Sequence, residues 1–274
     1  MTQRAPTSLV ALDVDGTIID LDERLTDRVR AAVRAVADAG HEVVVATGRS
    51  LHGALPVLDR LGLTSGYAVV SNGAVTLRLD PHAERGYEVV DVVTFDPTPA
   101  LRLLREHLPS AAYAVEEMGT GFRLFGPFPD GELAGRITVV PFEELLGAPA
   151  TRVVVRSTDH TPEEFLALVE RIGLHGVNYA VGWTAWLDLA PEGVSKASAL
   201  EQVRRWLGVD ARRTLAVGDG RNDLEMLAWA GRSVAMGQAP DEVKEAADEV
   251  TSTVDEDGLA EVLEDLLEAR RAAG

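Results

Sequence analysis

The sequence has 274 residues, 46% hydrophobic and 26% charged, which is typical of a soluble globular protein and not of a disordered or fibrous one. This length allows a sizeable core and is compatible with two domains. The net charge of −18 argues against nucleic acid or an anionic membrane as a partner, because both would repel the protein, and the lack of cysteine excludes disulfides and thiolate metal sites.

The first predicted element is a short buried strand that ends at two aspartates. In LVALDVDGT, residues 9–17, the apolar run stops at Asp13 and Asp15, and Gly16 permits a sharp exit. Residues two apart share a face of a strand, but a chain leaving the strand can separate them, so the two carboxylates could take different roles. Taken alone, the stretch is equally compatible with an ordinary Asp-Gly turn.

The next elements alternate between helix and strand. We expect a helix capped by Thr26 and ended by Gly40, a strand at 43–46, a helix from Ser50 to about residue 61, and a strand at 67–70. This alternation predicts a parallel sheet with helices on its faces. The strand at 43–46 is followed by Thr47, Gly48 and Arg49, so polar groups again follow an apolar run.

The pattern changes near residues 80–86, where we place the start of an inserted α+β domain. Its predicted strands are 88–93, 112–118, 121–125, 152–157, 177–182 and 185–189, and its predicted helices are 98–107 and 161–172. We assign residues 85–189 to this insertion and residues 1–84 and 190–274 to the core, with hinges near Arg85 and Ala190.

The last part of the chain resumes the alternation. We expect helices at 195–207, from about 222, from 240 and at 259–270, with strands ending at 217 and 236. Lys196 lies in the first turn of one of these helices, and Asp219 and Asp223 follow the strand that ends at Val217. In parallel sheets, ligands bind beyond the carboxyl ends of the strands, where Asp13, Thr47 and Asp219 all fall.

These four segments, in this order, resemble the motifs of the haloacid dehalogenase superfamily of phosphotransferases. They are DVDGT at 13–17, TGR at 47–49, Lys196, and GDGRND at 218–223. The sequence is most similar to the Cof-type phosphatases (subfamily IIB), which carry a large C2-type cap between the second and third motifs. This resemblance implies a Rossmann-like, doubly wound α/β core with the insertion as an α+β cap.

The resemblance also implies the chemistry of the aspartates. Asp13 matches the nucleophile that forms an aspartyl-phosphate, and Asp15 matches the general acid and base. A dianionic substrate cannot approach several carboxylates without a cation, and oxygen ligands favour Mg²⁺. The family pattern assigns the metal to Asp13, to the main-chain carbonyl of Asp15 and to Asp219, with Asp223 supporting a metal-bound water or Lys196.

The phosphate-binding residues implied by the family are Thr47, Gly48 and Lys196. Only two of the 26 basic residues are lysine, and Lys196 lies where the helix dipole disfavours a cation, so a bound anion would explain it. The alternative is a solvated surface lysine. Thr47 could instead cap its own turn, and Gly48 serves chiefly for backbone geometry.

Several other residues keep two interpretations. Arg49 could contact substrate or pair with a core carboxylate, Asn222 could contact substrate or cap a helix, and Asn72 fits a tight turn better than a cleft. Residues 118–125 and 183–186 are candidates for substrate discrimination, although Trp183 and Trp186 could simply pack the cap sheet.

We therefore expect a Mg²⁺-dependent phosphatase that acts on small phosphate esters such as sugar phosphates. A mutase of the same superfamily is an alternative, since Arg123 or Arg156 could hold a second phosphate, and a catalytically silent binding protein is another. The first eight residues are polar and the apolar run behind them is too short for a signal peptide or a membrane span, so we expect a cytoplasmic protein. No pattern indicates an obligate assembly, so we expect a monomer or a weak homo-oligomer.

Overall fold

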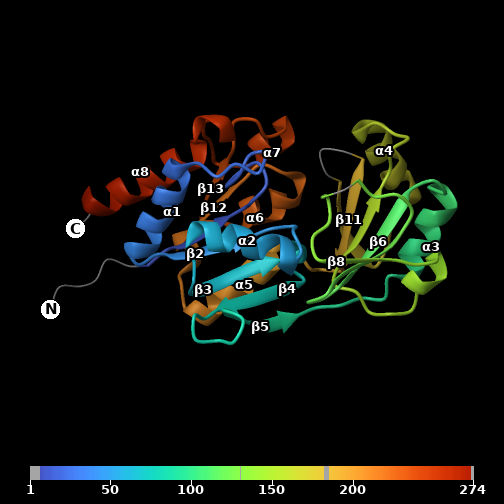
Figure 1. Ribbon diagram of the computed structural model, residues 1–274. Helices are drawn as coiled ribbons and strands as arrows, with labels where there is room; N and C mark the ends of the chain where they lie inside the picture. Colours follow the sequence, from blue (N-terminus) through green and yellow to red (C-terminus); the bar gives the residue numbers. More distant parts are fainter. Residues whose placement is uncertain (1–6, 130, 182–184, 273–274) are drawn as a thin grey trace.

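The computed structural model describes residues 7–129, 131–181 and 185–272, and these form a core built on one sheet and a cap built on another (Figure 1). The core sheet has the order β14-β13-β12-β1-β2-β3-β4-β5. Its strands are β1 Leu9–Leu12, β2 Glu42–Ala46, β3 Gly66–Val70, β4 Val75–Leu79, β5 Tyr87–Val92, β12 Thr214–Gly218, β13 Arg232–Ala235 and β14 Glu249–Val250.

The strands from β14 to β3 in this order pair in parallel, and β4 and β5 add an antiparallel edge. Both faces of the sheet are covered, because alternate residues of each strand point to opposite sides. Val10 and Leu12 of β1 belong to a cluster that includes α1 and α8, whereas Leu9 and Ala11 belong to a cluster that includes α5 and α6. The predicted doubly wound α/β core is therefore confirmed.

The core helices are α1 Asp27–Asp38, α2 Leu51–Leu61, α5 Lys196–Leu207, α6 Leu224–Trp229, α7 Asp241–Ala246 and α8 Gly258–Ala272. Two of the predicted helix starts are built as the sequence indicates. The Thr26 hydroxyl accepts a hydrogen bond from the Val29 amide, and Ser195 forms a reciprocal capping box with Ser198. Ser50 occupies the cap position of α2, but its side chain makes no capping hydrogen bond to the described residues. No helix in the described ranges is long and apolar enough to cross a bilayer.

The cap sheet has the order β10-β11-β9-β6-β7-β8 and is antiparallel except for the β7–β8 pair. Its elements are α3 Thr98–His107, β6 Ala112–Glu117, β7 Gly121–Phe125, β8 Arg136–Val139, β9 Val153–Arg156, α4 Pro162–Ile172, β10 Val177–Val181 and β11 Trp186–Pro191. Helices α3 and α4 pack on one face of this sheet, on residues such as Val153, Val155 and Leu187. The opposite face is turned toward the core (Figure 1).

The structure corrects the expected position of the first domain boundary. Strand β5, which we assigned to the cap, pairs antiparallel with β4 and forms the edge of the core sheet. The Val93 amide still bonds to Ala74 of the core, whereas Phe95 exchanges hydrogen bonds with Ala150 of the cap. The chain therefore crosses between the two sheets at residues 93–95, and not near Arg85.

The return crossing follows β11, whose last residue Pro191 still pairs with Val177 in the cap sheet. Helix α5 of the core begins only five residues later, at Lys196. Strands β4, β8 and the two-residue β14 were not predicted from the sequence. β4 lies between the turn at Asn72 and Gly73 and the turn residues 80–86, and no element was predicted for its residues.

Candidate active site

Two aspartates meet where β1 and β12 end. The two strands pair in parallel, and the Asp13 amide extends their ladder by donating to the Val217 carbonyl at 3.0 Å. The chain then turns at Gly16, whose φ is +82°, and a Cβ there would lie 2.1 Å from Asp219 Oδ2. Only glycine allows this close approach, so the backbone of the turn after β1 packs directly against the Asp219 carboxylate.

Lys196 is fully buried between carboxylates of this site. Its Nζ donates to Asp13 Oδ1 at 2.5 Å and to Asp223 Oδ1 at 2.7 Å. The side chain is 0% exposed, which excludes the alternative of a solvated surface lysine. The first turn of α5 thus delivers an ammonium group to the nucleophile position predicted for Asp13.

Asp223 is held by hydrogen bonds on both of its carboxylate oxygens. While Oδ1 accepts from Lys196, Oδ2 accepts from the amides of Asp219 and Gly220 at 3.0 and 2.9 Å. These bonds fix the loop that follows β12 and thereby the position of Asp219. This placement is compatible with the supporting role predicted for Asp223.

The carboxylates of Asp13, Asp219 and Asp223 form what we call the carboxylate cluster. One oxygen from each lies within 4.8 Å of the others, and all three residues are buried. Lys196 compensates only part of this charge. A buried set of oxygen donors with excess negative charge fits a hard divalent cation, and Asp13 and Asp219 are the members that keep oxygens free for it.

The electrostatics show the same excess of negative charge. Burial, followed by the neighbouring Asp223, raises the pKa of Asp13 well above its ordinary value, and burial raises the pKa of Asp219 to about 7. Burial by itself would lower the pKa of Lys196, but the carboxylates of Asp13 and Asp223 raise it instead. The site therefore holds a charged lysine, but this one positive charge is too little to balance the three carboxylates.

Comparison with known proteins identifies the family to which this site belongs. A family model described as haloacid dehalogenase-like hydrolase matches residues 10–100 and 134–263. The chain belongs to the haloacid dehalogenase-like hydrolases. Among its relatives, YkrA of Bacillus subtilis (strain 168) is 30% identical over 277 residues, covering 95% of this chain and 98% of YkrA, and the phosphatase YwpJ of the same organism is 28% identical over 292 residues, covering 94% and 99%.

A solved structure described as a HAD subclass IIB sugar phosphatase is similar in fold, with a TM-score of 0.79 and 23% identity over 95% of this chain and 99% of its own. The predicted membership of the superfamily is therefore confirmed, and the fold is similar to that of a structure described as subclass IIB, as the predicted Cof-type architecture requires. The prediction of an enzyme of the hydrolase type is confirmed as well.

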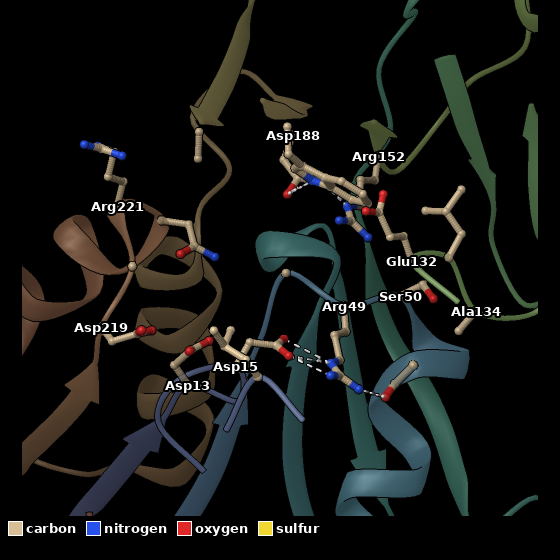
Figure 2. Close-up of a pocket in the computed structure, with 18 of the residues that line it drawn as sticks. Asp13, Asp15, Arg49, Ser50, Glu132, Ala134, Arg152, Asp188, Asp219 and Arg221 are labelled. Carbon is tan, nitrogen blue, oxygen red and sulfur yellow. Dashed lines mark hydrogen bonds and ion pairs between the residues drawn. The ribbon is translucent and has the colours of Figure 1, made fainter. Parts of the chain in front are cut away.

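In this hydrolase, the Asp15 side chain points away from the carboxylate cluster (Figure 2). This side chain is 51% exposed, and its carboxylate accepts hydrogen bonds from both Nε and Nη2 of Arg49, the shortest at 2.6 Å. Arg49 Nη2 also donates to Glu23 at 2.9 Å. Of the two interpretations of Arg49, the structure thus shows pairing with core carboxylates, from a position on the cavity wall.

The residues that follow β2 and the residues of the short helix η4 (Arg221–Asp223) lie around the turn Ser71–Gly73. Thr47 is buried, and its hydroxyl oxygen accepts from the Arg49 amide at 3.0 Å, so it does cap its own turn. Asn222 Nδ2 donates to Asn72 Oδ1 at 3.1 Å. Since Gly220 is the N-cap of η4 and Asp223 that of α6, the helix-cap interpretation of Asn222 is wrong. Gly48 lies against both asparagine side chains, with little room for a Cβ.

A cavity of about 600 Å³ lies between the carboxylate cluster and the cap. We call its cap side the cap wall, defined by Phe122, Arg152, Trp186 and Asp188. Arg152 Nε donates to Asp188 Oδ1 at 2.6 Å, and Trp186 Nε1 donates to Asp188 Oδ2 at 3.0 Å. Figure 2 shows Arg152 and Asp188 facing Asp15 and Arg49 across the cavity.

Arg152 and Asp188 were not predicted as site residues, although the sequence pattern contains a signal for them. Alternation along β9 and β11 puts Val153 and Leu187 under the helices and puts Arg152 and Asp188 on the other face, toward the core. Trp186 was noted and lies on this wall, whereas Trp183 lies outside the described residues. Gln238 was also missed, and it donates to Asp219 Oδ2 at 3.2 Å.

The cap arginines suggested for a second phosphate are engaged elsewhere. Arg123 pairs with Glu117 at 3.0 Å and donates to the Glu144 carbonyl, and Arg156 donates to the Ser157 carbonyl at 2.7 Å. Neither is among the described residues that line the cavity. This removes the observation that had favoured a mutase.

Proposed function

We propose that this hydrolase is a Mg²⁺-dependent phosphatase that cleaves small, soluble phosphate monoesters through an aspartyl-phosphate at Asp13. The observation that carries the proposal is the carboxylate cluster: a buried aspartate held by Lys196, next to a second aspartate able to share a cation, at the floor of a cavity. The cavity volume of about 600 Å³ suits a metabolite and not a polymer.

The role of Asp13 follows from its position. Its carboxylate oxygen attacks phosphorus in line with the leaving oxygen, the bond to that oxygen breaks, and the phosphoryl group passes to Asp13. Water then attacks the same phosphorus and releases inorganic phosphate and the free carboxylate. The Lys196 ammonium holds Asp13 in place and offsets the negative charge that develops on the phosphoryl oxygens.

Asp13 and Asp219, with the main-chain carbonyl of Asp15, would hold the magnesium ion. When bound, the ion neutralises phosphate charge so that an anionic nucleophile can approach. Asp223 keeps Asp219 in position through the amides of the loop after β12. Thr47 and Gly48 complete the phosphate site, since the Thr47 hydroxyl accepts one hydrogen bond and keeps its own hydrogen to donate.

Asp15 would act as general acid and then as general base. Its carboxylate faces the cavity on the side away from Asp219, where a leaving oxygen would lie (Figure 2). It must first leave the ion pair with Arg49, so Arg49 would orient Asp15 between turnovers. As general acid, Asp15 would give a proton to the leaving oxygen, which is needed because an alkoxide is a poor leaving group.

The cap would close over the substrate and limit access of bulk water. Its two connections to the core, residues 93–95 and 192–195, are both short. We therefore propose residues 93–95, in place of Arg85, and the segment after Ala190 as the hinges, with the domain boundary at the end of β5.

A panel of phosphorylated metabolites, assayed for released phosphate with and without Mg²⁺, tests the proposal. We expect hydrolysis of at least one small monoester, loss of it with chelator, and its abolition in Asp13→Asn. The exposed Asp59 on α2 provides a matched control, because Asp59→Asn removes the same charge far from the cavity. Equal rates in Asp13→Asn and wild type would refute the nucleophile, and an isomeric ester as product would indicate a mutase.

A further inference from the structure

The cap wall contains a guanidinium group whose donors are only partly used. Arg152 is 6% exposed and lines the cavity, yet its one hydrogen bond to the described residues is the Nε bond to Asp188. Its terminal nitrogens have no hydrogen-bond partner among those residues and face the cavity (Figure 2). A buried group of this kind needs a polar partner, which a bound molecule can supply.

Beside these donors lie acceptors and an aromatic surface. Both oxygens of Asp188 are fixed, one by Arg152 and one by Trp186, and each keeps a lone pair for a further bond. The Arg152 guanidinium carbon lies 5.9 Å from the centre of the Trp186 ring. Donors, acceptors and an apolar surface at one place suit a molecule whose hydroxyl groups both donate and accept.

The charge of the cavity argues against an anion at this wall. Each described arginine that lines the cavity already has a carboxylate partner: Arg49 pairs with Asp15 and Glu23, Arg152 with Asp188, and Arg221 with Glu242. Glu132 adds another carboxylate to the cap side of the cavity, 3.4 Å from Arg156. Since Glu132 is itself paired with Arg156, a second anionic group on the substrate would meet cations that already have carboxylate partners.

We propose that the Arg152–Asp188 pair selects substrates by the charge of the leaving group, accepting a neutral, hydroxyl-rich alcohol and rejecting one with a second anion. This inference rests on the proposed phosphatase function and adds the residues that set specificity. Asp188 keeps Arg152 neutralised, so the wall binds hydroxyl groups through hydrogen bonds and gives no net attraction to a carboxylate or phosphate.

The test compares two esters that differ at one end only. Sorbitol 6-phosphate ends in a hydroxymethyl group and 6-phosphogluconate in a carboxylate, at the position farthest from the phosphate. We expect wild type to favour the first by at least about tenfold in kcat/KM, because like charges are disfavoured at close range. Inhibition constants against p-nitrophenyl phosphate give the same ratio if either ester reacts slowly.

Asp188→Asn should reduce this preference by about tenfold, because it removes the carboxylate that interacts most strongly with Arg152 and leaves more of the Arg152 charge available to an anion. Glu132→Gln, which removes the other cap-side carboxylate, should act in the same direction by a smaller factor and serves if Asp188→Asn fails to fold. Glu163→Gln on the exposed first turn of α4 removes an equal charge away from the cavity and should leave the ratio unchanged.

A wild-type preference for 6-phosphogluconate, or an unchanged ratio in both cavity variants, would overturn the inference while leaving the phosphatase proposal intact. Equal losses of kcat/KM on both esters in the cavity variants would also overturn the inference, because they would show that the substituted residues have only a structural role. If wild type neither hydrolyses nor binds either ester and releases no phosphate from p-nitrophenyl phosphate, the proposed function fails and this inference fails with it.

Discussion

The carboxylate cluster and the cap wall face each other across one cavity but are built in different ways. The cluster is positioned by backbone: strands β1 and β12 end side by side, and the Asp219 and Gly220 amides hold Asp223. The cap wall is positioned by side chains on one face of an antiparallel sheet. The difference suggests that the chemistry is fixed by the fold, whereas selectivity depends on residues that can change without altering it.

Removal of the lysine is the strongest way to break the cluster. Lys196→Met leaves Asp13 and Asp223 buried without their cation, so we expect a loss of about 3 kcal/mol in the free energy of unfolding and of about 10³ in kcat/KM. Urea unfolding and phosphate release measure the two effects. Lys244→Met, which replaces the only other lysine, should change stability by less than about 0.5 kcal/mol. Wild-type activity in Lys196→Met would refute the account of the cluster.

Asp219→Asn tests whether the cluster holds the metal. The substitution removes one of the two carboxylates that keep oxygens free, so the Mg²⁺ concentration for half-maximal activity should rise about 100-fold or more. Titration of activity with Mg²⁺ measures this shift. Asp241→Asn at the exposed start of α7 should leave the titration unchanged. An unaltered Mg²⁺ requirement in Asp219→Asn would place the ion elsewhere.

The pH dependence of metal binding tests the same excess of negative charge. The pKa of Asp219 is raised to about 7 in the fold, against about 3.9 in an unfolded chain. Without metal, its ionisation therefore costs stability increasingly as the pH rises from about 4 to about 7. Mg²⁺ should raise the melting temperature more at about pH 8 than at about pH 5. Asp219→Asn should weaken this difference, and an equal shift at both pH values would contradict it.

The smallest expected effect concerns the contact between the two regions. Ser71 of the core donates from its hydroxyl to Glu116 Oε2 of the cap at 2.8 Å, and both residues are buried. Ser71→Ala should cost about 1–2 kcal/mol, because it removes a donor from a buried carboxylate. Ser110→Ala, which removes an exposed bond to Asp159, provides the control in thermal unfolding. Equal effects in the two variants would show that Ser71 does not join core and cap.

The cluster could be predicted from sequence because its residues follow short apolar runs. Asp13 and Asp219 each come directly after a strand, and parallel strands that alternate with helices bring such ends together. Lys196 was identifiable from its position at a helix start and from the scarcity of lysine. The orientation of the side chains could not be predicted: Asp15, two residues beyond Asp13, turns outward to Arg49.

The cap wall was harder to predict because its contacts depend on which strands become neighbours. Arg152 and Asp188 meet only because β9 pairs with β11, and nothing local to either residue specifies that pairing. The same limit explains β5, whose strand character was correctly predicted while its sheet was wrong. Its pairing with β4 could not be predicted, because β4 itself was not predicted as a strand.

The most direct test of the account is to look for the phosphoryl group on Asp13. The enzyme would be mixed with a substrate found in the metabolite panel and with Mg²⁺, quenched in acid within the first turnover, and digested for peptide mass analysis. We predict a phosphoryl group on the peptide that contains Asp13, absent from Asp13→Asn. Release of phosphate within that turnover without modification of this peptide, or modification of another residue, would contradict the central claim.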